Sequence, residues 1–285
     1  MSTYIESIIL GIVEGLTEFL PVSSTAHLRI TEALMRIPMD NAYWKMYTIV
    51  IQMGAILALL LLFLGRTVGF LRTFPKGEDG RHTWFNHPLT ITLVAFVCTS
   101  VPALLLHKWS ERNLGSLTAI ALALLIGGIV MWLVDWRAGR YDAETDQVEQ
   151  MNLLHGIWIG LCQALSAVFP GVSRSMSTIA AGQVVGLSRP AALEFSFLLS
   201  IPTMVAATGW DFIKEVHGGE AANVAMNSER WIVLLIGLAV SFIVAFGVVE
   251  WFLYWVRKHG FAIFAIYRIL LGGALLLWGS RFIGH

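Results

Sequence analysis

Two glutamates near the N-terminus, Glu14 and Glu18, lie four positions apart in an apolar segment. On a helix, side chains at this spacing face the same way, one turn apart. An ionised side chain at membrane depth costs about 2.5–3.5 kcal/mol or more, so a divalent cation or a cationic partner would offset both this cost and the mutual repulsion. The pair is therefore a candidate metal site and a source of a general base. The alternative is a pair of glutamates exposed to water at an interface.

A turn rich in hydroxyl groups follows directly. The segment S-S-T-A-H at Ser23–His27 comes just after Pro21, where a second helix should begin. Ser and Thr are ordinary helix N-caps, but capping accounts for only one of the three hydroxyls. His27 lies three residues beyond Ser24, on the same helical face. Ser24 is therefore a candidate nucleophile, and His27 a candidate proton-transfer group.

A second turn, P-G-V-S-R-S at Pro170–Ser175, places an arginine at another expected helix start. Free backbone N–H groups and the helix dipole favour an anion there, and the guanidinium of Arg174 can bind phosphate through two hydrogen bonds. The turn is a candidate phosphate cradle. The alternative is that Arg174 only pairs with Glu14 or Glu18 and holds two parts of the chain together. The candidate substrate-binding residues are Arg174, Ser173, Ser23, Thr25, Gly171 and Ser175.

The two turns belong to two similar segments of the chain, Gly11–His27 and Gly160–Met176, which form an approximate sequence repeat. The two prolines align, and so do Ser24 and Ser173. The first copy holds the carboxylates and the histidine, whereas the second holds the arginine. This division predicts one composite site where the two copies meet.

Composition predicts the environment of this site. The 285 residues are 56% hydrophobic and only 13% charged, too few polar groups to cover a soluble globule. We therefore expect an all-α integral membrane protein with about six spanning helices. The predicted spans are Tyr47–Leu64, Leu89–Leu106, Leu117–Val134, Ala191–Trp210, Trp231–Trp255 and Ala262–Trp278. A net charge of zero gives no sign of a nucleic-acid partner.

The segments with the two turns are too interrupted to be ordinary spans. A proline pushes the preceding residue out of the helical region, so each segment should form a re-entrant helix–loop–helix hairpin that lines a cavity. The chain is then a single membrane domain, 1–285, in which 1–140 and 150–285 each contain a hairpin and three spans. Three is odd, so the repeats should be inverted, with the site at their interface. The polar stretch Asp135–Gln150 is the expected linker.

The distribution of basic residues between the two faces predicts the orientation. A small excess of Lys and Arg on one face places the loop at 66–88 in the cytoplasm and both termini outside. The oligomeric state is left open, with a homodimer as one arrangement to test.

At these motifs the sequence resembles the undecaprenyl pyrophosphate phosphatase family, also called the bacitracin-resistance family. E-G-L-T-E-F-L-P-V-S-S-T-A-H matches its first motif and P-G-V-S-R-S its second, and the resemblance extends to F-S-F-L-L-S-I-P at 195–202 and Y-R-I-L-L-G at 267–272. Ala26 and Met176 stand where the family usually has glycine. These two departures bear on the local geometry of the loops rather than on the chemistry.

The resemblance implies hydrolysis of undecaprenyl pyrophosphate to undecaprenyl phosphate and inorganic phosphate, which recycles the lipid carrier for cell-wall synthesis. It implies a multi-pass protein of the bacterial cytoplasmic (inner) membrane, with the site facing the periplasm, and a divalent cation, Mg²⁺ or Ca²⁺. In the mechanism we expect, Glu14 and Glu18 hold the cation, Arg174 clamps the diphosphate, Ser24 attacks and His27 shuttles the proton. A glutamate as base, nucleophilic His27 and direct attack by water are the alternatives.

Two other functions compete with this interpretation. Inverted repeats with broken helices are also typical of transporters, so a polyprenyl-phosphate transporter or flippase is the main alternative. The other class of membrane lipid phosphatase carries a histidine six residues after its S-R pair, and this chain has Ala180 there.

Overall fold

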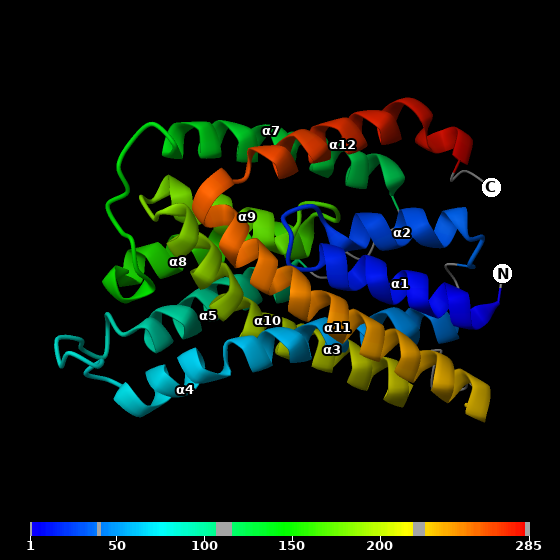
Figure 1. Ribbon diagram of the computed structural model, residues 1–285, viewed down its shortest axis with the longest axis horizontal. Coiled ribbons are helices and arrows are strands. Elements are labelled where there is room, and N and C mark those ends of the chain that lie inside the picture. The colour runs from blue at the N-terminus through cyan, green and yellow to red at the C-terminus, as the bar shows by residue number, and fades with distance from the viewer. Residues whose placement is uncertain (1, 39–40, 107–115, 219–225, 283–285) are drawn as a thin grey trace.

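The computed structural model describes residues 2–38, 41–106, 116–218 and 226–282, and in these ranges the regular secondary structure is helical, apart from one isolated bridge between Thr145 and Leu187. Figure 1 shows the helices as a bundle whose long axes run roughly along the longest dimension of the molecule. They are α1 (Thr3–Thr17), α2 (Ser24–Leu34), α3 (Ala42–Leu62), α4 (Leu64–Thr73), α5 (Pro88–Leu105), α7 (Leu117–Ala138), the short 3₁₀ helix η1 (Val148–Gln150), α8 (Leu153–Val168), α9 (Arg174–Val184), α10 (Arg189–Gly218), α11 (Ser228–His259) and α12 (Ala262–Phe282).

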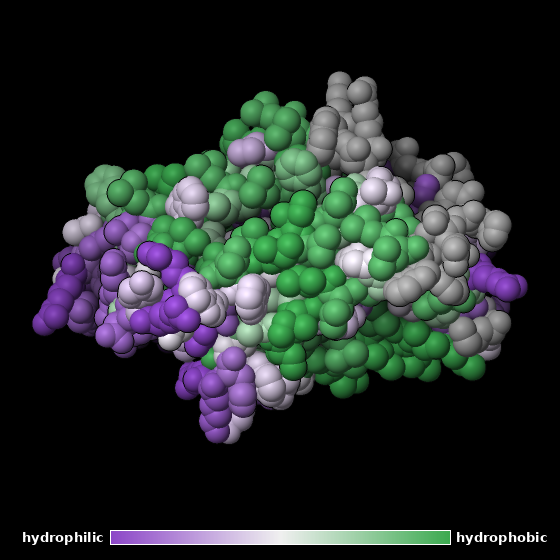
Figure 2. All heavy atoms as spheres, turned by 90° about the horizontal axis from the view of Figure 1, so that it is seen from above, coloured by the Kyte–Doolittle hydropathy of each residue, from purple (hydrophilic) through white to green (hydrophobic). Residues whose placement is uncertain are grey.

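The predicted spans correspond to real helices. In the described part of the chain, α3, α5, α7, α10 and α11 are long and apolar enough to cross a membrane, and the sixth predicted span coincides with α12, whose apolar part Ala262–Leu277 is shorter. Large apolar side chains such as Leu105, Ile243 and Leu270 are more than half exposed, and Figure 2 shows a broad apolar surface over the middle of the molecule. The prediction of an all-α integral membrane protein is confirmed.

The two predicted hairpins are formed by α1 with α2 and by α8 with α9. In Figure 1, α1 runs inward from the end where the N-terminus lies and α2 returns toward that end, while α8 and α9 do the same from the opposite end. The two turns meet in the interior, where the hydroxyl of Ser175 donates a hydrogen bond to the carbonyl oxygen of Leu20 at 3.0 Å. Two segments some 150 residues apart in the sequence are thus in direct contact.

Glycines let each hairpin pack closely on a spanning helix of the other half. Helix α1 packs along α11, and α8 packs along α5. At Gly11 a Cβ atom would lie 2.8 Å from the carbonyl oxygen of Gly237, and Gly160 meets the carbonyl oxygen of Ala95 in the same way. Close backbone approach through small residues is how helices associate without a hydrophobic driving force. The division into inverted repeats at 1–140 and 150–285 stays a prediction.

One expectation about the linker is wrong. Asp135 does not belong to a solvated connection, because α7 continues to Ala138 and the Asp135 side chain is buried. Its carboxylate accepts hydrogen bonds from Arg189 Nε at 2.7 Å, from Gln183 Nε2 at 3.1 Å and from the backbone N–H of Phe261 at 3.1 Å. A carboxylate that looks like the start of a polar loop instead joins α7 to the ends of three later elements.

Replacing Asp135 with alanine is therefore expected to destabilise the fold. Breaking a buried ion pair costs about 3–5 kcal/mol, and because Arg189 is a third exposed we expect about 2 kcal/mol. The midpoint of thermal unfolding of the purified protein in detergent measures the loss. Asp142→Ala, at an exposed position between α7 and η1, is the control and should unfold like the wild type. Equal midpoints for the two variants would contradict the anchoring role.

Candidate active site

Both hairpin turns start their second helix from a serine in an unusual backbone conformation. Ser23 (φ 75°) precedes α2, and Ser173 (φ 69°) precedes α9. Each side chain accepts a hydrogen bond from the backbone N–H three residues on, at Ala26 and Met176 respectively, both at 3.4 Å. A positive φ is uncommon for residues other than glycine and is typical of strained functional sites. Matching serine caps thus hold the first turn of α2 and the first turn of α9 in place.

The structure changes which residues of the two repeated segments are equivalent. Aligning the prolines pairs Ser24 with Ser173, but Ser23 is the second residue after its proline whereas Ser173 is the third. The two N-caps, Ser23 and Ser173, are therefore the equivalent positions. Ser24 then corresponds to Arg174, the first residue of α9. The hydroxyl and the guanidinium occupy the same place in the two hairpins.

A chain of polar contacts joins these two residues through a glutamate. The Ser24 hydroxyl donates to Glu18 Oε2 at 2.5 Å, and Arg174 Nη2 lies 3.4 Å from Glu18 Oε1. Both Glu18 and Arg174 are mostly buried, and Arg174 Nη1 is a buried nitrogen without a hydrogen-bond partner. The arrangement provides a hydroxyl in contact with a base, next to a cation that still has a donor to offer.

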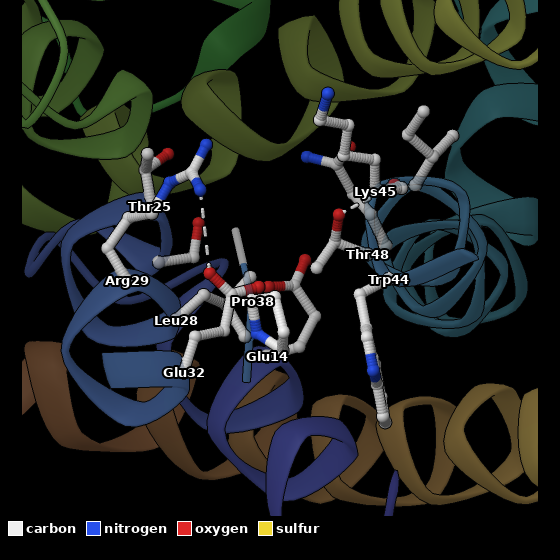
Figure 3. Close-up of a pocket in the computed structure, with 12 residues that line it drawn as sticks. Glu14, Thr25, Leu28, Arg29, Glu32, Pro38, Trp44, Lys45 and Thr48 are labelled. Carbon is white, nitrogen blue, oxygen red and sulfur yellow. Dashed lines mark hydrogen bonds and ion pairs between the residues drawn. The ribbon is translucent and has the colours of Figure 1, made fainter. Parts of the chain in front are cut away.

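Glu14 lies one turn before Glu18 on α1 and is 1% exposed. Its Oε2 atom is buried without a hydrogen-bond partner. Together with Ser24 it lines a cavity of about 180 Å³, shown in Figure 3. The polar residues of this lining are Glu14, Ser24, Thr25, Arg29, Glu32, Trp44, Lys45, Thr48 and Gln52. Arg29, Glu32 and Lys45 were not among the site residues expected from the sequence, because nothing in their spacing links them to Glu14.

His27 does not contact Ser24 in this structure. Its Nδ1 atom lies 2.7 Å from the carbonyl oxygen of Ser23, and its Nε2 atom lies 2.6 Å from the hydroxyl of Tyr267, on which the ring stacks. Both ring nitrogens are therefore engaged elsewhere. A spacing of three residues places two side chains on one face, but it does not prevent the ring from turning to the preceding carbonyl and to a residue 240 positions away. Glu18 is the group that contacts Ser24.

Arg268, in the Y-R-I-L-L-G segment, has a specific place in the structure. Its side chain is fully buried. The guanidinium donates to the carbonyl oxygens of Pro21 at 3.2 Å, Gly171 at 3.2 Å, Val172 at 3.1 Å and Ala123 at 3.1 Å. The first three belong to the two hairpin turns. One arginine therefore fastens both turns to each other and to α7.

The remaining predicted residues support the turns. Ser175 contacts Ser173 Oγ at 3.2 Å in addition to the carbonyl oxygen of Leu20, while Thr25 lines the cavity. The structure thus brings Ser24, Glu18 and Arg174 into one chain of contacts, whereas His27 faces Tyr267. In the described ranges, no three His, Cys, Asp or Glu side chains are arranged to hold a metal ion by themselves.

Comparison with known proteins agrees with this architecture. The family model described as "Bacitracin resistance protein BacA" matches residues 7–274. A protein from Koribacter versatilis named undecaprenyl-diphosphatase is 56% identical over 99% of this chain and 100% of its own length. Proteins of the same name from Caldanaerobacter subterraneus and Rhizobium etli are 39% and 40% identical, over 97% and 96% of this chain and 96% of their own lengths. The chain belongs to the bacitracin resistance protein BacA family.

Proposed function

We propose that the protein is an undecaprenyl-diphosphatase, which hydrolyses undecaprenyl diphosphate to undecaprenyl phosphate and inorganic phosphate. The observation that carries this proposal is the contact chain from Ser24 through Glu18 to Arg174, at the place where two hairpins meet inside an apolar bundle. A lipid diphosphate needs such a site, since its chain stays in the bilayer while its head reaches polar groups. The family and the names of the relatives support the same reaction.

The proposed chemistry has two steps. Ser24 Oγ attacks the terminal phosphorus and gives its proton to Glu18, and the bond from this phosphorus to the bridging oxygen breaks. Glu18 passes the proton to that oxygen as undecaprenyl phosphate leaves. A water molecule then attacks the phosphorylated serine, with Glu18 accepting its proton and returning one to Ser24 as phosphate departs. Positioned acid–base and nucleophilic groups each accelerate such transfers.

Arg174 is the proposed clamp for the diphosphate. Its unpartnered Nη1 donor can take an oxygen of the transferring group while Nη2 stays near Glu18. The first N–H groups of α9 add donors, since helix N-termini favour anions. The serine caps and Gly171 hold this helix start in place. Stabilising charge on the transferring phosphoryl group is the main task of a site of this kind.

A divalent cation, Mg²⁺ or Ca²⁺, is part of the proposal. The donor set fits, because Glu14 offers a buried carboxylate oxygen without a partner, next to Glu18. Both oxygens of Glu18 already contact protein groups, so Glu14 is the better ligand of the two. When bound, the cation would neutralise charge on the diphosphate. Hard cations of this type prefer oxygen ligands.

His27 is, in this proposal, a positioning residue. Its contacts with the carbonyl oxygen of Ser23 and the hydroxyl of Tyr267 tie the start of α2 to α12. The ring thus helps to hold the residue before Ser24.

The proposal includes the membrane and the direction in which the site faces. We place the protein in the bacterial cytoplasmic membrane, with the cavity open to the periplasm. The start of α3 and helix α2 line the cavity at the end of the molecule where the N-terminus lies, the end that the Lys and Arg distribution places outside. All the site residues come from one chain, so a homodimer is not required for a complete site.

Phosphate release from undecaprenyl diphosphate by the purified protein in detergent, with and without EDTA, tests the proposed function. We expect release that EDTA abolishes and that excess Mg²⁺ or Ca²⁺ restores. The absence of release from folded protein would overturn the proposal.

A transporter remains the second candidate, because two hairpins entering from opposite ends of the molecule are also found in transporters. Lipid vesicles that contain the protein separate the two. Movement of labelled polyprenyl phosphate without phosphate release would favour transport, and release without movement would favour the enzyme.

Replacing Arg268 with methionine is expected to lower the rate about 100-fold, since a shift of about 1 Å in a catalytic group has an effect of this size. Methionine keeps the volume but removes the donors that fasten the two turns. Steady-state phosphate release at saturating substrate measures the change.

Gly127 offers a second test of this role. A Cβ atom there would lie 2.5 Å from Arg268 Nη2, so Gly127→Ala should displace the guanidinium and cause part of the same loss. Gly273→Ala on α12 is the control, since its Cβ atom would meet nothing within 4 Å. Wild-type rates in both Arg268→Met and Gly127→Ala would show that Arg268 does not position the turns.

A further inference from the structure

The cavity beside Ser24 contains a carboxylate that the proposed reaction does not use. Glu32 lies on α2 eight residues after Ser24, so the two side chains fall on one face of the helix with Leu28 between them. Glu32 is 5% exposed, and its carboxylate lies 3.6 Å from Arg29, which is itself a third exposed. A buried carboxylate with so loose an ion pair is costly unless another cation completes its surroundings.

The unpartnered oxygen of Glu14 faces the same space. Glu14 and Glu32 both line the cavity, and in Figure 3 their carboxylates, from α1 and α2, point toward the same part of it. Glu14 is 1% exposed, and its buried Oε2 atom has no hydrogen-bond donor. A divalent cation in this space would offset the cost of burying both carboxylates.

Glu18 is placed differently from these two. It is not part of the cavity lining, and its two carboxylate oxygens contact Ser24 and Arg174. Glu18 is thus the carboxylate that contacts Ser24, whereas Glu14, which also lies beside Glu18, shares the cavity lining with Glu32.

We propose that Glu14 and Glu32, rather than Glu14 and Glu18, form the protein's share of a divalent-cation site, and that oxygens of the substrate diphosphate complete it. This proposal rests on the proposed function. Mg²⁺ commonly binds through one or two carboxylates together with substrate phosphates, and retains several waters. Two protein carboxylates also agree with the lack of a complete set of three metal-ligating side chains in the described ranges.

The proposal gives Arg29 a definite part. Its guanidinium neutralises Glu32 while no cation is bound, and it is exposed enough to turn into water when a cation arrives. Arg29 and a divalent cation thus compete for the same carboxylate. Removing the arginine charge should strengthen cation binding, whereas removing the Glu32 charge should weaken it.

Binding of Mn²⁺ to the purified protein in detergent, in the presence of methylenediphosphonate as the non-hydrolysable diphosphate, tests this site. The loss of the electron paramagnetic resonance signal of free Mn²⁺ measures binding. Glu32→Gln should weaken binding at least tenfold, because even residues that only support a metal ligand are worth about 10–100-fold. Glu18→Gln is the matched comparison: it removes a charge beside Glu14 but no proposed ligand, so it should weaken Mn²⁺ binding clearly less than Glu32→Gln does. Arg29→Gln should bind more tightly than the wild type.

Kinetics provide a second measurement. In Glu32→Gln the Mg²⁺ concentration for half-maximal phosphate release should rise at least about tenfold, while the rate at saturating Mg²⁺ should change much less. Wild-type Mn²⁺ binding by Glu32→Gln, or an equal loss in Glu18→Gln, would overturn the proposal. If Glu32→Gln does not fold, Glu32→Asp replaces it, since a shortened carboxylate should weaken binding without removing the charge. Mn²⁺ binding does not depend on turnover, so failure of the proposed function and failure of this site give different results.

Discussion

Ser24→Ala is expected to abolish phosphate release, with a loss of at least about 10⁴-fold, because the atom proposed to attack phosphorus is removed. The hydroxyl already lies 2.5 Å from the Glu18 carboxylate that is to take its proton. The initial rate of release at saturating substrate and Mg²⁺ measures the loss. Wild-type rates in this variant would eliminate the serine route and leave attack by water or by His27.

Two further experiments separate loss of the nucleophile from loss of structure. Ser23→Ala removes the neighbouring hydroxyl, which caps α2 through Ala26, and should mainly lower thermal stability. Substrate labelled at the terminal phosphorus should leave the label on Ser24 after an acid quench of the wild type. Absence of the labelled serine under single-turnover conditions would count against a covalent intermediate.

The role of Glu18 follows from the same contact. If Glu18 acts only on the proton of Ser24, Glu18→Gln should lose about 10²–10⁴-fold, and the double variant with Ser24→Ala should lose no more than Ser24→Ala alone. Residues that act as a unit show this lack of additivity. Additive losses would mean that Glu18 acts separately from Ser24.

Much of this site could be predicted from sequence because burial of charge is costly. Glu14, Glu18 and Arg174 in apolar segments called for mutual compensation, and the prolines and hydroxyl groups indicated interrupted helices. Composition alone indicated a helical membrane protein. These inferences depend on local pattern and on the bilayer as solvent, so they did not require knowledge of the tertiary structure.

The contacts that the sequence did not predict share a different cause. His27 turns to Tyr267, Arg268 reaches carbonyl oxygens of both hairpin turns, and Asp135 holds groups from three later elements. These partners lie about 50 to 250 residues away, and spacing along one helix says nothing about them. The equivalence of Ser23 with Ser173 also depended on loop geometry, since one extra residue after the second proline shifts the helix start.

Arg174→Met is expected to reduce phosphate release about 10³–10⁵-fold, the range associated with an arginine that stabilises the transferring phosphoryl group. The residue donates toward Glu18 through Nη2, while Nη1 is buried without a partner. Arg174→Lys should recover only part of this loss, since an ammonium cannot bind phosphate through two coplanar donors. Full activity in the lysine variant would mean that charge alone is needed.

Thermal unfolding of the same variant separates loss of the clamp from loss of structure. Removing Arg174 leaves the buried charge of Glu18 with one partner fewer, so Arg174→Met should lower the unfolding temperature. Adding Glu18→Gln removes that charge and should recover most of the lost stability without restoring phosphate release. If Arg174 only held the hairpins together, the activity of Arg174→Met would return when it is assayed well below its unfolding temperature.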